Sequence, residues 1–231
     1  ATRFGQLAID VGNNQNNIYV KTRAYFIYGI FIEHWTKGYE SSIRSLRTAQ
    51  QCAEQYGLSY VVTASSCFIC TLELLSGQGL KSLYESLQYE QMQFSKRASV
   101  LSADFLAEFQ HWVEALRRNE KVPNWDYSLT LQNDESVIAM HYTLRLQMSY
   151  LFYESEQAVE ILERLQQTVK DVYPLPNTPL YYLYRSLWQI DFMNAGADLQ
   201  YHRQYKLDIK ESLKKFKKWS KTASHNFEHL Y

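Results

Sequence analysis

The feature that most constrains this chain is a pair of helical patterns between Ile18 and Gly57. In the first pattern, apolar residues crowd most of the helix circumference, which predicts a largely buried helix: Tyr25, Ile27, Tyr28, Ile30, Phe31 and Ile32. In the second, they recur every three or four positions among polar residues, which predicts one solvent-exposed face and one buried face. The apolar positions of the buried face are Ile43, Leu46, Ala49, Ala53 and Tyr56. The break at 34–38 separates the two patterns, and Gly57 ends the second because glycine can adopt a positive φ. A buried helix followed by a half-exposed helix is the unit of an α-helical repeat array.

The same alternation recurs along the rest of the chain. Periodicity predicts further helices at 3–12, 60–75, 80–96, 104–118, 135–152, 156–172, 180–194 and 199–221. The strongly apolar helices begin near positions 20, 60, 104, 137 and 180, a repeat of roughly 40 residues that is typical of helix-pair solenoids. The helix at 3–12 reads as the second half of a hairpin whose partner lies upstream, so we expect a segment of a longer protein.

The sequence therefore predicts an all-α fold, an antiparallel helix-hairpin repeat array that forms a right-handed, TPR-like (tetratricopeptide-like) α-solenoid. A stretch without helical period at 119–133, which contains Pro123 and Asn124, is the longest predicted loop. Loops of this length within a helical body are often functional. We expect this loop to separate an N-terminal sub-array at 1–118 from a C-terminal sub-array at 134–231.

Composition excludes several classes of protein. Hydrophobic residues make up 46% of the 231 positions, so the chain is not intrinsically disordered, and 8 Gly with 4 Pro are too few for an all-β fold. The 24 Lys and Arg balance 24 Asp and Glu, which argues against nucleic-acid and membrane partners. No apolar run reaches the ~18 residues of a membrane span. With three cysteines and no leader pattern, we expect a cytoplasmic protein.

Two short motifs have the spacing of chemical sites. His225-Asn226-Phe227-Glu228-His229 matches the inverted zincin pattern, in which two histidines bind zinc and the glutamate activates a water. Cys67-Phe68-Ile69-Cys70 has the spacing of a redox pair. The first motif has no room for a downstream third ligand, and the second lies in a strongly apolar helix, where cysteines pack as small apolar groups. Packing explains both motifs better than metal or redox chemistry.

Other polar residues within the apolar helices do not form a catalytic set. His34 and His141 are lone histidines, and Ser65-Ser66 lack the Gly-x-Ser-x-Gly elbow of a nucleophilic serine. Three acids lie in apolar helices, and two arginines are available to pair with them or to line a polar channel: Glu33, Glu73 and Asp191, with Arg145 and Arg185. We expect no catalytic residue, no cofactor and no metal site.

The segment 206–221 is rich in lysine and also contains Phe216 and Trp219. A basic helix with aromatic residues could bind phosphate groups or an anionic membrane. A solvated outer face with cations near the helix C-terminus explains the same residues, and we favour this interpretation.

The richest aromatic cluster, together with two arginines, supplies the candidate partner-binding residues: Tyr181, Tyr182, Tyr184, Arg185, Trp188 and Arg145. If part of this cluster lines the concave side of the array, it forms a peptide groove, because Tyr and Trp supply large, stiff contact surfaces. If all of it faces the neighbouring hairpin, it is hydrophobic core. The sequence does not separate these two interpretations.

Scattered segments carry a family resemblance. They are 4–9 (Phe-Gly-Gln-Leu-Ala-Ile), His34-Trp35, Leu74 to Leu83, 141–147 (His-Tyr-Thr-Leu-Arg-Leu-Gln) with 150–152 (Tyr-Leu-Phe), Lys218-Trp219 and 226–229 (Asn-Phe-Glu-His). In this order they resemble the helical-repeat region of signalling proteins that combine a Ser/Thr protein kinase, an AAA-type (STAND-like) ATPase and a sensor histidine kinase. The resemblance spans nearly the whole chain and implies a tetratricopeptide-like region between the ATPase and the histidine kinase. The family's catalytic motifs are missing from this sequence.

Three functions follow from these observations. The first is a non-catalytic interaction or regulatory module of a bacterial signalling protein, which binds a protein, a peptide or a neighbouring domain and transmits that state as a change in superhelix. The second is a receptor that holds a peptide or small molecule within the curved array. The third is an enzyme, which would need a closed cavity with convergent carboxylates. We favour the first and expect no enzymatic activity.

Overall fold

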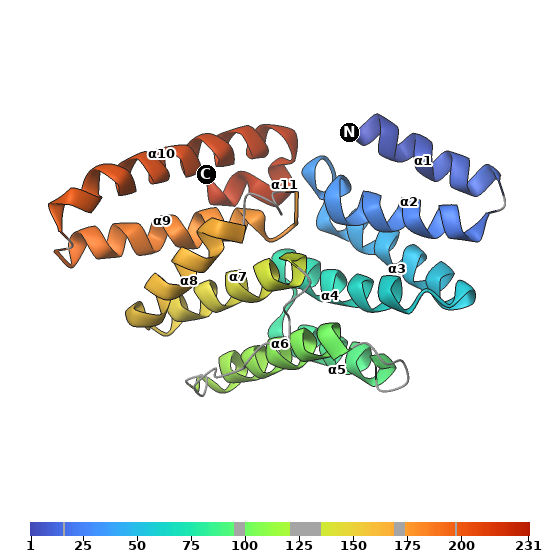
Figure 1. Cartoon of the computed structure of the whole chain (residues 1–231), viewed down its shortest axis with the longest axis horizontal. Helices are drawn as coiled ribbons and strands as arrows, with labels where there is room; N and C mark the ends of the chain where they lie inside the picture. Colours follow the sequence, from blue (N-terminus) through green and yellow to red (C-terminus); the bar gives the residue numbers. More distant parts are fainter. Residues whose placement is uncertain (16, 95–99, 121–134, 169–173, 197) are drawn as a thin grey trace. The chain divides into compact units, whose positions relative to one another are not determined.

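The computed structural model describes residues 1–15, 17–94, 100–120, 135–168, 174–196 and 198–231. Within these ranges every regular element is a helix and none is a strand (Figure 1). The α-helices are α1 (Thr2–Asn14), α2 (Ile18–Phe31), α3 (Tyr39–Tyr56), α4 (Ser59–Leu75), α5 (Leu80–Phe94), α6 (Val100–Arg118), α7 (Glu135–Leu151), α8 (Ser155–Thr168), α9 (Thr178–Asn194), α10 (Leu199–Thr222) and α11 (Ser224–Phe227). Two short 3-10 helices accompany them, η1 (Glu33–Trp35) and η2 (Glu228–Leu230). The prediction of an all-helical fold is confirmed.

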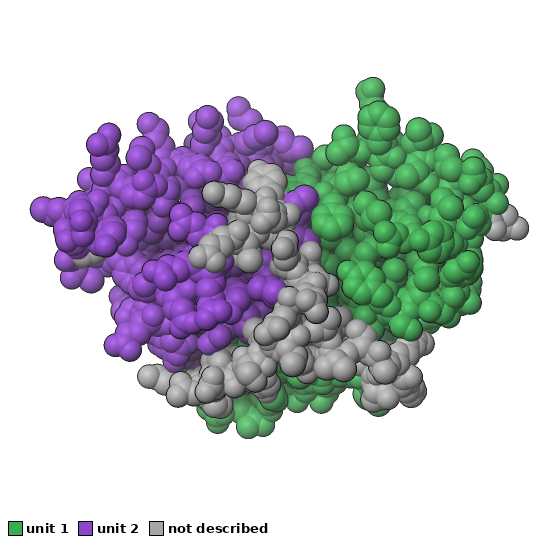
Figure 2. Space-filling view, viewed as in Figure 1, with its two compact units in different colours: residues 1–133 green, residues 134–231 purple. Residues whose placement is uncertain are grey.

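The helices belong to two compact units, Ala1–Asn133 (unit 1) and Asp134–Tyr231 (unit 2), which Figure 2 colours separately. In unit 1, α1 packs on α2, α2 on α3, α3 on α4, and α5 on α6. In unit 2, α7 packs on α8 and α9, and α9 packs on α10. The predicted loop at 119–133 lies outside the described residues except for Asn119 and Glu120, and it stays a prediction.

The first full hairpin forms where its turn signals lie in the sequence. α2 begins after Asn17, whose side-chain oxygen accepts a hydrogen bond from the Val20 backbone N–H at 3.2 Å. The predicted break between the two helices is occupied by η1. α3 ends at Gly57, whose φ of 78° lies in the left-handed region that favours glycine. The ends of both helices were therefore readable from local residues.

α4 supplies the most buried stretch of unit 1. Its residues 61–73 are all buried, because α3 packs on the helix and α5 and α6 also contact it. Close approach of α2 and α3 depends on Gly29, where an added Cβ would lie 3.0 Å from Leu46 Cγ. Of the apolar face predicted for α3, Leu46, Ala49 and Ala53 are buried, whereas Tyr56 at the end of the helix is 54% exposed.

The core of unit 2 is built from aromatic side chains. Trp188 of α9 is 1% exposed, and its indole N–H donates a hydrogen bond to Ser149 Oγ of α7 at 3.2 Å. Trp219 of α10 and Phe227 of α11 pack with their ring centroids 6.0 Å apart. Large rings thus fill the spaces between these helices. None of the described helices has both the length and the apolar character needed to cross a membrane.

Candidate functional site

An open apolar groove lies between α1 and α2 in unit 1. Its volume is about 580 Å³. It is lined by Phe4, Gly5, Leu7, Ala8 and Val11 of α1, and by Tyr19, Val20, Arg23, Ala24, Ile27, Tyr28 and Ile32 of α2 and its end. Contiguous exposed apolar surface of this kind marks interaction sites on folded proteins.

Large side chains form two ridges that border the groove. On α1, Phe4, Leu7 and Val11 follow one helix face at spacings of three and four residues. Phe4 is 79% exposed and Leu7 is 57% exposed. On α2, Arg23 and Ile27 lie one turn apart, and both are exposed. The groove is therefore bordered by exposed side chains, of which Phe4 and Leu7 keep more than half of their contact with solvent.

Two glycines bring α1 and α2 close together. A Cβ at Gly5 would lie only 2.3 Å from Cδ2 of the Tyr28 ring. A Cβ at Gly12 would lie 2.9 Å from the Lys21 Cα atom. Because real Cβ atoms do not approach so closely, both positions require glycine at this helix spacing. The glycines thus set the distance between the two ridges.

The groove lies in a cationic neighbourhood. α1 and α2 together carry Arg3, Lys21 and Arg23, and their only carboxylate is Asp10. Arg23 lines the groove itself, and it forms no ion pair with the residues that the structure describes. The site therefore combines apolar surface with an uncompensated positive charge at its border.

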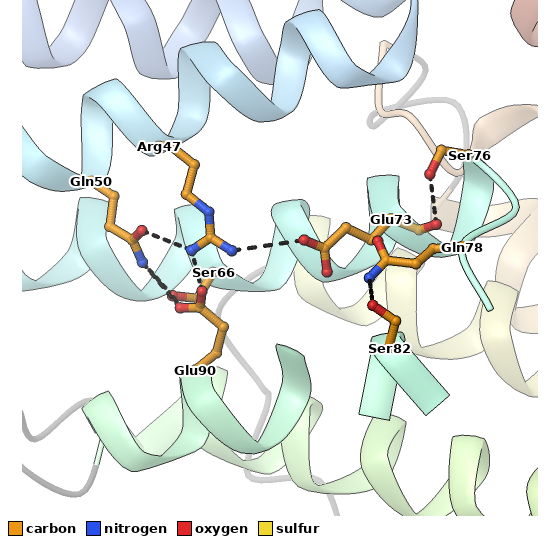
Figure 3. Close-up of polar contacts among 8 residues, drawn as sticks. All are labelled: Arg47, Gln50, Ser66, Glu73, Ser76, Gln78, Ser82 and Glu90. Atoms are coloured by element: carbon orange, nitrogen blue, oxygen red, sulfur yellow. Dashed lines mark hydrogen bonds and ion pairs between the residues drawn. The ribbon is translucent and has the colours of Figure 1, made fainter. Parts of the chain in front are cut away.

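A buried polar cluster links three other helices of unit 1 (Figure 3). Glu90 of α5 is 0% exposed, and its Oε1 accepts a hydrogen bond from Arg47 Nη1 of α3. Its Oε2 accepts from Ser66 Oγ of α4 and from Gln50 Nε2 of α3, the latter at 3.0 Å. Both oxygens of this carboxylate are satisfied by the chain itself. The cluster therefore joins helices and offers no free group to a ligand.

Glu73 of α4 lies beside this cluster and is less well satisfied. Its Oε1 is 3.7 Å from Arg47 Nη2, whereas its buried Oε2 accepts no hydrogen bond from the residues that the structure describes. Burial raises the pKa of Glu73, and the nearby Ser86 and Arg47 oppose this shift only in part. Because it is buried, Glu73 binds a proton more readily than an exposed glutamate, and the nearby Glu90 carboxylate adds to this effect.

The residues that resembled catalytic groups are buried in unit 1. Cys67 and Cys70 lie within the α4 core, and burial raises the pKa of the Cys70 thiol well above its ordinary value. A protonated, inaccessible thiol is a poor nucleophile. His34 is also buried, and desolvation lowers its pKa to about 3, which keeps the ring neutral near pH 7. These placements fit the packing roles that the sequence favoured.

The predicted partner-binding residues of α9 are divided between core and surface. Tyr181, Tyr182 and Trp188 are buried in unit 2, which fits the core alternative for these three rings. Tyr184 and Arg185 are half-buried, as is Arg145 of α7, and their role in partner binding stays a prediction.

Arg185 connects α9 to α10. Its Nη2 donates hydrogen bonds to the Asp208 carbonyl oxygen and to Ser212 Oγ, both at 3.2 Å. The guanidinium also lies over two rings, with distances of 5.3 Å to the Tyr181 centroid and 5.0 Å to the Tyr182 centroid. The structure therefore gives this arginine a role in helix packing.

The buried acids of unit 1 pair with partners other than those predicted. Glu33 pairs with Lys37, one turn away, at 3.0 Å, and Glu73 lies near Arg47 of the neighbouring helix. The prediction that Arg145 and Arg185 would neutralise these two acids is wrong. Each acid instead lies near a cation on the next helical turn or on the neighbouring helix.

The zincin-like motif does not lie on one regular helix. His225 belongs to α11, whereas His229 belongs to η2, and both histidines are exposed. Between them, Asn226 and Phe227 are buried. Among the residues that the structure describes, no group of three His, Cys, Asp or Glu side chains could hold a metal ion.

On α10, Lys206, Lys210 and Lys214 are exposed, whereas Phe216 and Trp219 are buried. These two rings are therefore unavailable for stacking on a nucleic-acid base, which fits the solvated-face interpretation of 206–221.

Comparison of the chain with protein-family models, curated proteins and solved structures finds no match. The function must therefore be argued from the geometry of the site.

Sequence reasoning did not identify the groove as a site. It predicted only that 3–12 is the second half of a hairpin whose partner lies upstream. Such a helical pattern predicts that one face of the helix is apolar, but it does not indicate which neighbour covers that face. The one available signal was Arg23, a cation within an otherwise strongly apolar helix.

Proposed function

We propose that this chain is a non-catalytic protein-interaction module, a regulatory helical-repeat segment of a multidomain cytoplasmic signalling protein. The observation that carries the proposal is the open apolar groove between α1 and α2. Consecutive packing of the helices within each unit supports a TPR-like solenoid, in which each hairpin contacts its neighbours and leaves helix surfaces free for partners. The buried, neutral His34 and the buried thiol of Cys70 support a binding role over a catalytic one.

The form of the groove favours a protein ligand over a small molecule. Its volume lies within the range of about 300–1,000 Å³ that is usual for small-molecule sites. However, such sites enclose most of their ligand, whereas Phe4 and Leu7 project into solvent. A protein surface laid along the groove would cover both side chains. Full burial of one large apolar side chain contributes about 1.5–3 kcal/mol, so a few such contacts can drive association.

A designed peptide tests this proposal. The probe is a fluorescently labelled amphipathic peptide of roughly four helical turns, with leucines on one face and glutamines elsewhere. Fluorescence anisotropy is expected to show saturable binding, and Leu7→Glu is expected to weaken it by about tenfold or more because a charge enters the apolar site.

The matched control is Val159→Glu, which places the same charge at an exposed valine of α8 in unit 2. This variant should bind the peptide as the wild type does. Equal binding by all three proteins, or binding by none of them, would show that the groove is not a docking site.

A further inference from the structure

We infer that the occupant of the α1–α2 groove is an acidic amphipathic α-helix of a partner protein, in place of the upstream hairpin helix that the sequence predicted for α1. This inference rests on the proposed function and names the chemistry of the partner. Three observations on unit 1 carry it: the spacing of the groove ridges, the way the other helices of the unit pack, and the unpaired charge of Arg23.

The ridges have the spacing that accepts a helix. Phe4 to Val11 border one side over seven residue steps, and Tyr19 to Ile27 border the other over eight. At a rise of ~1.5 Å per residue, each ridge is about 10–12 Å long, which matches about two turns of a third helix. Side chains on helices pack as ridges into grooves, so one large partner residue per turn would enter between the ridges.

An extended peptide fits less well. An added strand gains most of its affinity from backbone hydrogen bonds to an exposed sheet edge. The walls of this groove are two helices whose backbone groups are already bonded within each helix. Side-chain contacts are therefore the main source of affinity, and an amphipathic helix concentrates such contacts on one face.

Unit 1 already contains a helix seated in the same manner. α4 packs on α3 and also contacts α2, so a third helix lies against the α2–α3 pair. The α1–α2 pair has the same hairpin arrangement, and its groove is open. A partner helix in this groove would continue the packing order of the unit.

The charges specify the partner's polar face. Arg23 lines the groove, and the two helices that form it carry Arg3, Lys21 and Arg23 against the single carboxylate of Asp10. A partner with Glu or Asp beside its apolar stripe would neutralise Arg23, whereas one with Lys would be repelled. A second copy of this chain would bring the same cations face to face across a twofold axis. Charge therefore favours an acidic partner over self-association.

Two peptides with the same leucine stripe test this inference. One carries glutamates at the positions flanking the stripe and the other carries lysines there. In low salt the acidic peptide is expected to bind the chain roughly tenfold more tightly than the basic peptide, and the difference should shrink as salt screens the charges. Arg23→Glu is expected to reduce or reverse this preference. Arg44→Glu, at an exposed position of α3 away from the groove, should leave it unchanged.

The outcomes separate this inference from the function on which it rests. If both charged peptides and the neutral peptide bind equally, and Arg23→Glu changes nothing, the groove binds helices but the acidic partner is wrong. If sedimentation shows a dimer that Leu7→Glu converts to a monomer, the occupant is a second copy and the inference is overturned. If no peptide binds and the chain stays monomeric, both proposals fail.

Discussion

The two units differ in how they hold their buried charges. Two of the buried carboxylates of unit 1, Glu33 and Glu90, are surrounded by directed donors from neighbouring segments. In unit 2 the charge is a largely buried cation, Arg185, held by two ring faces and by oxygen acceptors of α10. A carboxylate depends on donors at particular positions, whereas a guanidinium over rings depends mostly on broad, weakly directional contacts.

Glu33 illustrates the unit 1 arrangement. Its two oxygens accept hydrogen bonds from Lys37 Nζ at 3.0 Å, Ser41 Oγ at 2.7 Å and Ser45 Oγ at 2.6 Å. These donors lie at the end of η1 and along α3, so the carboxylate fixes how the two segments meet. Loss of such an acid leaves several donors unsatisfied at once. We therefore expect unit 1 to be the more sensitive of the two units to removal of one buried charge.

The largest expected effect is at Glu90. Glu90→Ala should lower the free energy of unfolding by about 3 kcal/mol, because it leaves Arg47, Gln50 and Ser66 without their shared acceptor. Urea denaturation followed by circular dichroism measures the change. Glu85→Ala, at an exposed position of the same helix, should change stability by less than about 0.5 kcal/mol. Equal losses in the free energy of unfolding from Glu90→Ala and Glu85→Ala would contradict the view that unit 1 depends on directed bonds to its buried carboxylates.

Next in size is the pH dependence that His34 gives to unit 1. Its pKa in the folded chain is about 3, against 6.5 for an exposed histidine. As pH falls below 6.5 the unfolded chain takes up a proton that the folded chain does not, so stability is full above pH 6.5 and is lost towards pH 3. The loss should reach about 2 kcal/mol by pH 5.

Denaturation curves at several pH values measure this loss. The slope between pH 6.5 and pH 5 should be smaller in His34→Gln, whatever the overall stability of that variant. His225→Gln, at an exposed position, should keep the wild-type slope. A slope that is identical in all three proteins would contradict the assignment.

Arg185 tests unit 2. Arg185→Lys keeps the charge but loses the planar fork that donates to Asp208 and Ser212, and it weakens the ring contacts. We expect a loss of about 1–2 kcal/mol in the free energy of unfolding, less than for Glu90→Ala. Arg203→Lys, at an exposed position of α10, is the matched control. A loss as large as that of Glu90→Ala would show that directed bonds dominate in both units.

The smallest expected effect is a gain at Glu73. Its pKa is raised in the folded chain, so its contribution to stability is full below the unfolded value of 4.5 and declines as pH rises through the folded pKa. Glu73→Gln removes the second carboxylate facing Arg47 and should raise stability at pH 8 by about 0.5 kcal/mol relative to pH 4. A pH profile that matches the wild type would show that Glu73 is already well solvated.

Local features of the fold were predictable from the sequence, and long-range pairings were not. Gly57 and the apolar period of α3 define a helix and its end within a few residues. The Arg47–Glu90 pair spans 43 positions, and no local period indicates which helix faces which. The acids of unit 1 were therefore recognised as needing partners, but the partners were misassigned.

The candidate site depended on the same long-range information. The helical period at 3–12 was recognised in the sequence, but the exposure of Phe4, Leu7 and Val11 depends on what packs against α1. The buried rings of Tyr181 and Trp188 show the converse case, in which a promising aromatic cluster is enclosed by its neighbours. An amphipathic helix has the same sequence pattern whether its apolar face is exposed or buried, so only the assembled fold distinguishes the two cases.

The glycines at positions 5 and 12 have a further consequence. Each lowers the intrinsic helix-forming tendency of α1 by about 1 kcal/mol relative to alanine, so this helix depends on its neighbour to stay ordered. A ligand bound against α1 would stabilise the helical conformation of this segment. Occupancy should therefore be readable in the chain's own backbone, as slower exchange of the α1 amide hydrogens with solvent.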